Sequence, residues 1–328
     1  MHNSSKAWLM AFAMGILVPG LLFSVCSKIV SREENNPPSQ SPTVVTEPTR
    51  SPQEPQQTTA QLVAVLMPEG QVEMNMETYL TGVLLAEMPV DFDTEALKAQ
   101  AVVSRTYALR RNAVGNKHPQ GAVCTESFCC QAYRSVDDFL SKGGTTEMLE
   151  KVTQAIVSTQ DQVLTYNGAL IEATYFSCSG GRTEDALAVW GTDIPYLQAV
   201  DSPGEENASH FVDAAEFSVD EFAGLLGVPP DAVALGAVTH TDGGGVATMI
   251  ISGKQFSGTE IRQKLGLRST AFTMYASDGK VYISTRGFGH RVGMSQYGAE
   301  AMAVRGSDYQ EILYHYYPGT QLTVYTRN

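Results

Sequence analysis

One segment of this chain limits what can fold, because residues 31–61 are rich in proline, serine, glutamine and threonine and nearly lack large apolar side chains. Such a segment cannot bury enough surface to offset the chain entropy that folding removes. We therefore predict a disordered tether over residues 31–61 and a folded extracytoplasmic domain over residues 62–328. The folded part is long enough to enclose one large core, or two cores that pack together.

An apolar stretch precedes the tether. Residues Ala7 to Val25 are nearly all apolar, and their number matches the length that crosses a bilayer. We therefore predict that residues 1–30 form a short cytoplasmic tip and a transmembrane signal anchor, which makes this a single-pass protein of the cell membrane. Cleavage of a signal peptide near Ser24 or Ser27 is one alternative, and lipidation at Cys26 is another.

The composition excludes one class of partner. The formal net charge is -13 at pH 7, with 17% of residues charged and 43% hydrophobic. Non-specific nucleic-acid binding depends on lysine and arginine side chains that neutralise phosphates, and this chain has no dense basic stripe. We therefore expect no nucleic-acid partner, and we interpret the acidity as favouring solubility.

The folded part mixes helical and strand patterns that do not alternate as a wound parallel sheet requires. A strand is predicted at residues 63–67, and hairpins are predicted to turn at Asn167-Gly168 and Asp278-Gly279. Helices are predicted over residues 76–88, 95–112 and 147–159, and after the N-cap residues Ser218 and Ser257. The predicted fold is α+β, with mixed helices and antiparallel hairpins around a substrate cleft.

Glu87 is the strongest candidate for a catalytic residue. It follows an apolar string at the end of the predicted helix 76–88, and Pro89 disfavours helix at the residue before it. Lost hydration and the partial negative charge of a helix C-terminus both raise the pKa of a carboxyl group. A raised pKa suits a general acid that must hold its proton near neutral pH. A solvated or capping glutamate is the alternative interpretation.

Two basic residues share one side of the next predicted helix. Lys98 and Arg105 are two helical turns apart within residues 95–112, so their side chains point in the same direction. They form either a solvated basic edge or a pair of donors that lines a cleft beside Glu87.

A cluster of nitrogen and sulfur ligands follows in a short loop. His118, Cys124, Cys129 and Cys130 suit one tetrahedral zinc ion, and four protein ligands would make the site structural because no position is left for water. The adjacent Cys129 and Cys130 need a sharp turn to reach one ion. A disulfide, such as Cys124 with Cys178, is the alternative in a domain outside the cytoplasm.

Two polar loops come later. The string from Tyr175 to Glu184 contains Ser177, Ser179 and two glycines, which could let a polar polymer approach the backbone, although a glycine turn is the commoner meaning. In the other, four glycines surround His290 between residues 286 and 299. The histidine either faces a cleft or bonds to the backbone. No Lys-Ser or Lys-Thr pair follows, so this is not a P-loop.

Five separated strings resemble the stage II sporulation protein D family. They occur in order between Leu62 and Leu322 and read LLAEMP, EALKAQAVVSRTYAL, YFSCSGGRTE, VWG with PYL, and GFGH followed by VGMSQYGA. The predicted anchor and tether also resemble that family. The sequence departs from the family at Arg291, where glycine is usual, and this change could alter the cleft around His290.

The resemblance implies a lytic transglycosylase of spore-forming bacteria, which cuts peptidoglycan between N-acetylmuramic acid and N-acetylglucosamine during engulfment. It carries the catalytic role to Glu87 and a zinc site to the region from His118 to Cys130. It also implies work in the space between mother cell and forespore, beside a peptidoglycan amidase and a membrane scaffold protein of the engulfment complex.

One acid suffices for this chemistry, because the carboxyl can first donate a proton to the glycosidic oxygen and then accept one from the sugar's C6 hydroxyl. The residues expected to hold the glycan are Lys98, Arg105, Tyr175, Ser177, Ser179, His290 and Gln296. Two other function classes stay open: a zinc-dependent peptidoglycan amidase, and a non-catalytic glycan-binding scaffold.

Overall fold

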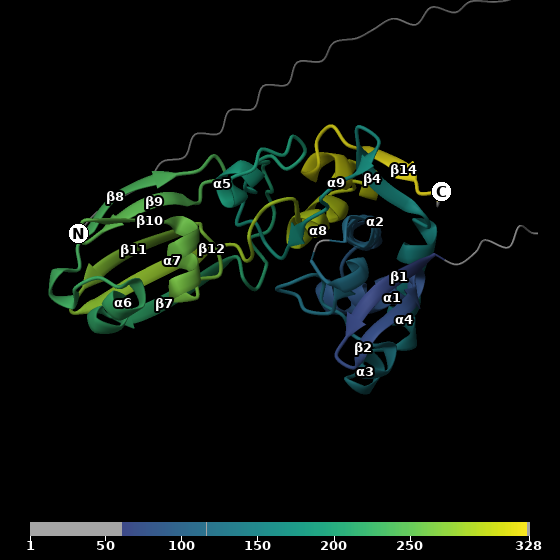
Figure 1. Ribbon diagram of the computed structural model, residues 1–328, viewed down its shortest axis with the longest axis horizontal. Helices are drawn as coiled ribbons and strands as arrows, with labels where there is room; N and C mark the ends of the chain where they lie inside the picture. The colour runs from purple at the N-terminus through teal and green to yellow at the C-terminus, as the bar shows by residue number, and fades with distance from the viewer. Residues whose placement is uncertain (1–60, 116, 327–328) are drawn as a thin grey trace, which may run out of the picture. The chain divides into compact units, whose positions relative to one another are not determined.

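The computed structural model describes residues 61–115 and 117–326 (Figure 1). The predicted anchor and all but the last residue of the predicted tether lie outside the described residues. Within those two ranges, no helix is both long enough and apolar enough to cross a membrane.

A first hydrophobic core is built mainly from helices. Its helices are α1 (Met76–Glu87), α2 (Thr94–Val114), α3 (Val136–Ser141), α4 (Thr146–Ser158), α5 (Ala186–Trp190), α8 (Gln296–Val304) and α9 (Tyr309–Tyr316). The central helix is α2, which packs against α1, α4, α8 and α9. Asp93 caps its first turn by accepting from the Glu95 amide, and Gly115 ends it in the left-handed conformation that glycine adopts without strain.

Short strands surround these helices. The strands are β1 (Leu62–Met67), β2 (Gly70–Asn75), β3 (Val123–Cys124), β4 (Gln162–Tyr166), β5 (Ala169–Leu170), β6 (Tyr175–Phe176), β13 (Met294–Ser295) and β14 (Gln321–Val324). They form sheets in the orders β2-β1-β3, β14-β4-β5 and β13-β6. The predicted turn joins β4 to β5, where Asn167 and Gly168 both have positive φ as a tight hairpin requires.

A second core lies between residues 212 and 286 and is drawn in green in Figure 1. One sheet has the order β11-β12-β7, from β7 (Val212–Ser218), β11 (Phe272–Ser277) and β12 (Lys280–Arg286). The other has the order β10-β9-β8, from β8 (Leu235–His240), β9 (Val246–Ile251) and β10 (Lys254–Ser257). Two helices, α6 (Val219–Leu226) and α7 (Gly258–Leu265), share this core, and Ser218 and Ser257 cap them as predicted.

The predicted α+β class with antiparallel hairpins is confirmed, and two of the local differences have a clear physical reason. Helix α1 ends at Glu87 because Met88 is already extended, at φ -128° and ψ 136°, as the residue before Pro89 should be. Strand β2 was not predicted. Its alternating side chains are mostly exposed, so the sequence lacks the apolar pattern of a buried strand.

Candidate active site

A cleft of about 1140 Å³ opens beside the C-terminus of α1. Residues from Leu85 to Pro89 form one side, and Tyr175 to Ser177 on and after β6 form another. The loop before α8 contributes His290, and α8 itself begins with Gln296, which also lines the cleft. Four of the sequence-predicted glycan-binding residues therefore share one cavity with Glu87: Tyr175, Ser177, His290 and Gln296.

Glu87 is partly buried in this cleft. Its Oε1 accepts a hydrogen bond of 2.6 Å from the backbone N–H of Ala132. Burial raises the pKa of the Glu87 carboxyl, and the Ala132 hydrogen bond together with the nearby polar side chains of Tyr175 and Gln296 opposes that rise in part. The raised pKa agrees with the sequence prediction, and desolvation is its main cause. Burial thus favours the protonated form, and the surrounding donors favour the carboxylate, which are the two forms that a general acid and then a general base require.

Gln296 presents an unused donor to the cleft. The residue is only 5% exposed, and its Nε2 has no partner at hydrogen-bonding distance among the described residues. Its proximity to Glu87 nevertheless lowers the pKa of that carboxyl. A buried donor without a partner is costly, so it favours a ligand atom that can accept from it.

His290 lines the cleft as a neutral imidazole. Its Nδ1 accepts from the backbone N–H of Val292 at 3.1 Å, which fixes the ring as the backbone-bonding alternative expected. Burial, together with the charge of Arg262, lowers the pKa of His290 to about 4. Its ring also packs against Phe176 and Trp190, with centroids 5.6 and 5.5 Å away. The side chain thus contributes shape and polarity to the cleft rather than charge.

Lys98 and Arg105 do not belong to the residues that line the cleft. The ammonium group of Lys98 pairs with Glu95 at 2.6 Å and lies 5.7 Å from the ring centroid of Tyr309. Arg105 is only 2% exposed and donates to the carbonyl oxygens of Ile156, Thr159 and Gln162. The expectation that these two residues hold the glycan is replaced by a structural role, in which Arg105 ties α2 to the end of α4.

Of the two predicted serines, Ser177 lines the cleft and Ser179 does not. Ser177 lines the cleft, and its backbone oxygen accepts from the Tyr297 amide at 3.0 Å. Ser179 is fully buried away from the cleft, where its hydroxyl and backbone N–H both donate to Glu205. The expected glycan contact of Ser179 is therefore corrected to a role in holding this loop together.

Glu172 is the only other carboxylate among the described residues that line the cleft. Arg110 Nε donates to its Oε2 at 2.9 Å, and Arg111 pairs with its other oxygen. Sequence reasoning missed this residue because its partners are some sixty residues away in the chain. Both oxygens of Glu172 are thus engaged by guanidinium groups, whereas no ion pair among the described residues involves Glu87.

Exposed aromatic side chains also line the cleft and were not predicted. They are Phe128, Trp190 and Phe288, whose exposed fractions are 88%, 42% and 36%. No pattern in the sequence distinguishes them from core aromatics. Exposed rings in a cleft suit the apolar faces of sugar rings.

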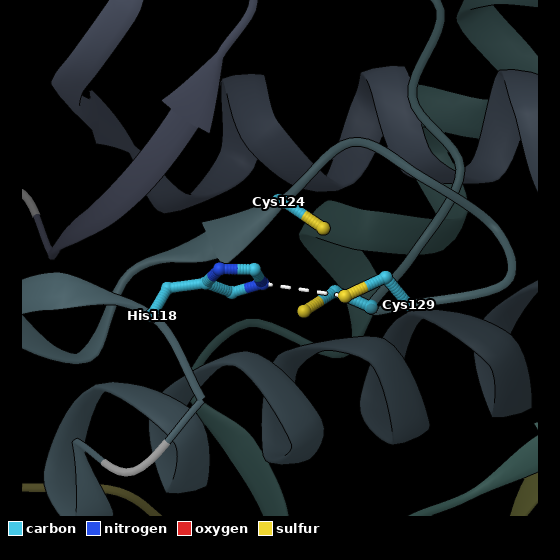
Figure 2. Close-up of side chains that lie close together, drawn as sticks. His118, Cys124 and Cys129 are labelled. Atoms are coloured by element: carbon cyan, nitrogen blue, oxygen red, sulfur yellow. Dashed lines mark hydrogen bonds between the residues drawn. The ribbon is translucent and has the colours of Figure 1, made fainter.

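The predicted ligand cluster does come together in space. The candidate ligand atoms of His118, Cys124, Cys129 and Cys130 all lie within 4.8 Å of one another. Figure 2 shows three of these side chains turned toward one another, with His118 Nε2 3.4 Å from Cys129 Sγ. One imidazole and three thiols at such spacing fit a tetrahedral zinc ion, whose Zn–S bonds are about 2.3 Å.

The alternative disulfide is not present, since all four cysteines in the described part of the chain are free. Cys178 is buried elsewhere, with its thiol 3.1 Å from Glu205 Oε2. The sharp turn that the adjacent Cys129 and Cys130 require is also present, because both amides bond to the carbonyl of Glu126.

Arg291 does not alter the cleft directly, because its side chain turns away from it. The guanidinium pairs with buried Glu184 at 3.1 Å and donates to the carbonyls of Ser179, Arg182 and Gly243. Its φ of 65° lies in the left-handed region, which is strained for arginine and free for glycine. This backbone geometry explains why glycine is suited to the position.

Comparison with known proteins agrees with the resemblance. Residues 70–166 match the family model described as stage II sporulation protein. Stage II sporulation protein D of Bacillus subtilis (strain 168) is 41% identical over 254 residues, which cover 76% of this chain and 74% of that protein. The protein of the same name from Bacillus amyloliquefaciens is 41% identical over 256 residues, with the same coverage. An amidase enhancer of B. subtilis is 29% identical over 304 residues, covering 75% of this chain and 40% of that protein.

Proposed function

This chain belongs to the stage II sporulation protein D family, a family of sporulation proteins, and on that premise we propose that it is a lytic transglycosylase of peptidoglycan. Its substrate would be the glycan bond between N-acetylmuramic acid and N-acetylglucosamine. The observation that carries the proposal is Glu87, a carboxyl with a raised pKa in a large cleft whose other carboxylate is held by two arginines.

The proposed reaction uses Glu87 twice. The protonated carboxyl first donates its proton to the glycosidic oxygen, and the bond from that oxygen to the anomeric carbon of the muramic acid breaks. The resulting carboxylate then takes the proton of the C6 hydroxyl as that oxygen bonds to the anomeric carbon. The product is a 1,6-anhydro end, Glu87 regains its proton, and no water is consumed. Glycosidases that hydrolyse usually need a second catalytic carboxylate.

The neighbours of Glu87 support this double use. Burial favours the protonated form that begins the reaction, and the Ala132 N–H with the polar side chains of Tyr175 and Gln296 favours the carboxylate that completes it. Gln296 lines the same cleft, and its Nε2 has no hydrogen-bond partner among the described residues. Phe128, Trp190 and Phe288 provide ring faces along the same cleft.

We further propose that His118, Cys124, Cys129 and Cys130 hold one structural zinc ion, which would cross-link an irregular loop. All four ligand positions would be taken by protein atoms, so the ion would have no open position for a water or a scissile amide. This donor set disfavours the zinc amidase alternative, which requires an open coordination site.

The proposed setting follows from the substrate. Peptidoglycan lies outside the cytoplasm, so the domain would act in the space between mother cell and forespore, held by an N-terminal membrane anchor. A peptidoglycan amidase that removes the stem peptides, and a membrane scaffold protein of the engulfment complex, would be its partners.

The test is an incubation of purified glycan strands with the wild-type chain, with Glu87→Gln, and with Glu73→Gln, a matched change on exposed β2. We expect anhydro-sugar ends from the wild type and from Glu73→Gln, and at least about a hundredfold less from Glu87→Gln because the amide cannot deliver a proton. Mass spectrometry of the products reads the result. Normal anhydro-sugar release by Glu87→Gln would reject the proposal, and binding without cleavage by every protein would favour the scaffold alternative.

A further inference from the structure

A buried chain of hydrogen bonds runs from α1 to the cleft through Gln131. The hydroxyl of Tyr79 donates to Gln131 Oε1 at 2.9 Å, and Gln131 Nε2 donates to the hydroxyl oxygen of Tyr175 at 3.1 Å. Tyr79 and Gln131 are both fully buried. Gln131 does not line the cleft, so it cannot contact a glycan there.

Gln131 fixes which group donates and which accepts along this row of hydrogen bonds. Its amide accepts at one end and donates at the other, so the Tyr79 hydroxyl and the Tyr175 oxygen are matched to different ends. Since the Tyr175 oxygen accepts from Gln131, its own O–H is free to be donated to a group other than Gln131. Glu87 is the acceptor that fits, because it lines the same cleft as Tyr175 and the Tyr175 side chain lowers the pKa of its carboxyl.

The same backbone segment reaches Glu87 a second time. Ala132, the next residue, donates its N–H to Glu87 Oε1 at 2.6 Å. The segment is seated on α1, because the Arg134 amide bonds to the Gly82 carbonyl at 2.9 Å. The ring of Tyr133 occupies the space that a side chain at Gly82 would need. Two adjacent residues, Gln131 and Ala132, thus lie on one fixed segment beside the Glu87 carboxyl.

We propose that Gln131 is a positioning residue of the active site, which holds the Tyr175 hydroxyl in the orientation that donates to Glu87. Its catalytic meaning rests on the proposed function, because the Tyr175 bond favours the carboxylate that Glu87 must become midway through the reaction. The hydrogen-bond chain itself does not depend on that function. Hydrogen bonds in such a buried chain polarise one another, so loss of the Gln131 donor weakens the bond from Tyr175 to Glu87.

The test compares Gln131→Met, which keeps the volume but removes both polar ends, with Gln100→Met. Gln100 is an equally buried glutamine on α2 that bonds to Ser104 and takes no part in the hydrogen bonds through Gln131. The Glu87 carboxyl is titrated by carbon NMR in the full chain without glycan, with its signal assigned from Glu87→Gln. We expect Gln131→Met to move the Glu87 titration to higher pH and to lower kcat roughly three- to tenfold at unchanged KM. Gln100→Met should change neither.

A double variant separates positioning from general damage. In a Tyr175→Phe background, Gln131→Met should no longer move the Glu87 titration, because the hydroxyl through which it acts is gone. An equal shift in both backgrounds, or no shift in either, overturns the proposal. If Gln131→Met does not fold, Tyr79→Phe removes only the first O–H of the chain and should move the titration in the same direction, and an unmoved titration then overturns the proposal. Failure of the proposed function would appear separately, as a wild type that titrates as expected but releases no anhydro product.

Discussion

Glu87 is subject to two opposing influences. Burial penalises its charged form, and the Ala132 hydrogen bond with the nearby polar side chains of Tyr175 and Gln296 favours that form without fully compensating for the burial. This balance suits a residue that must be protonated at one step of a reaction and charged at the next. The same balance has a measurable effect on stability, because a raised pKa means that the folded state holds a proton more tightly than the unfolded chain does.

Glu87→Gln should therefore be more stable than the wild type at about pH 8, and the difference should vanish at about pH 4. Above the raised pKa, the wild type must bury a charge that the amide lacks. Below the pKa of an unfolded glutamate both side chains are neutral, so the penalty disappears. Calorimetric Tm values across this pH range give the result. A Tm difference that is the same at every pH would contradict the raised pKa.

At the scale of elements, two segments that looked functional in the sequence differ in what they do. Arg105 on α2 binds three carbonyl oxygens at and just beyond the end of α4, where a helix leaves its last carbonyls without partners. The loop from His118 to Cys130 instead carries four potential ligands and then leads directly into Gln131 and Ala132, which serve Glu87. The first segment is structural, and the second is expected to connect stability with catalysis.

Arg105→Met should lower the free energy of unfolding by about 2–3 kcal/mol, because it removes the hydrogen bonds that a buried charged donor makes to three carbonyl oxygens. The folded fraction should still release the same products, since Arg105 does not line the cleft. Urea unfolding and product analysis of the same sample measure the two effects. A variant of normal stability with no activity would restore the glycan-binding role that the sequence suggested.

The ligand loop should contain about one zinc ion per chain, and stripping it with a chelator should lower the Tm. Cys130→Ser should lose the metal, whereas Cys178→Ser should keep it, because Cys178 lies outside the cluster and bonds to Glu205. Elemental analysis of the purified variants checks both. Equal zinc content in the two variants, or none in the wild type, would contradict the assigned ligands.

For the whole molecule, sequence reasoning succeeded where the determinants are local. The end of α1, the caps of α6 and α7 and the turn at Asn167 depend on neighbouring residues, so their patterns were visible. The ligand loop was visible for the same reason. Glu172 and Gln131 were missed because their importance comes from partners 44 to 62 residues away. Arg105 was misjudged because a helical pattern shows which residues share a side but not what that side contacts.

The central claim is that Glu87 is the single catalytic carboxyl, which donates a proton to the glycosidic oxygen and regains one from the C6 hydroxyl, so that no water is consumed. It is tested most directly by cleaving glycan strands in ¹⁸O-labelled water and analysing the new ends by mass spectrometry. We predict 1,6-anhydro ends that carry no label, because the C6 hydroxyl supplies the attacking oxygen. New reducing ends that carry ¹⁸O would show that water attacks the anomeric carbon, and the single-carboxylate mechanism would then be wrong.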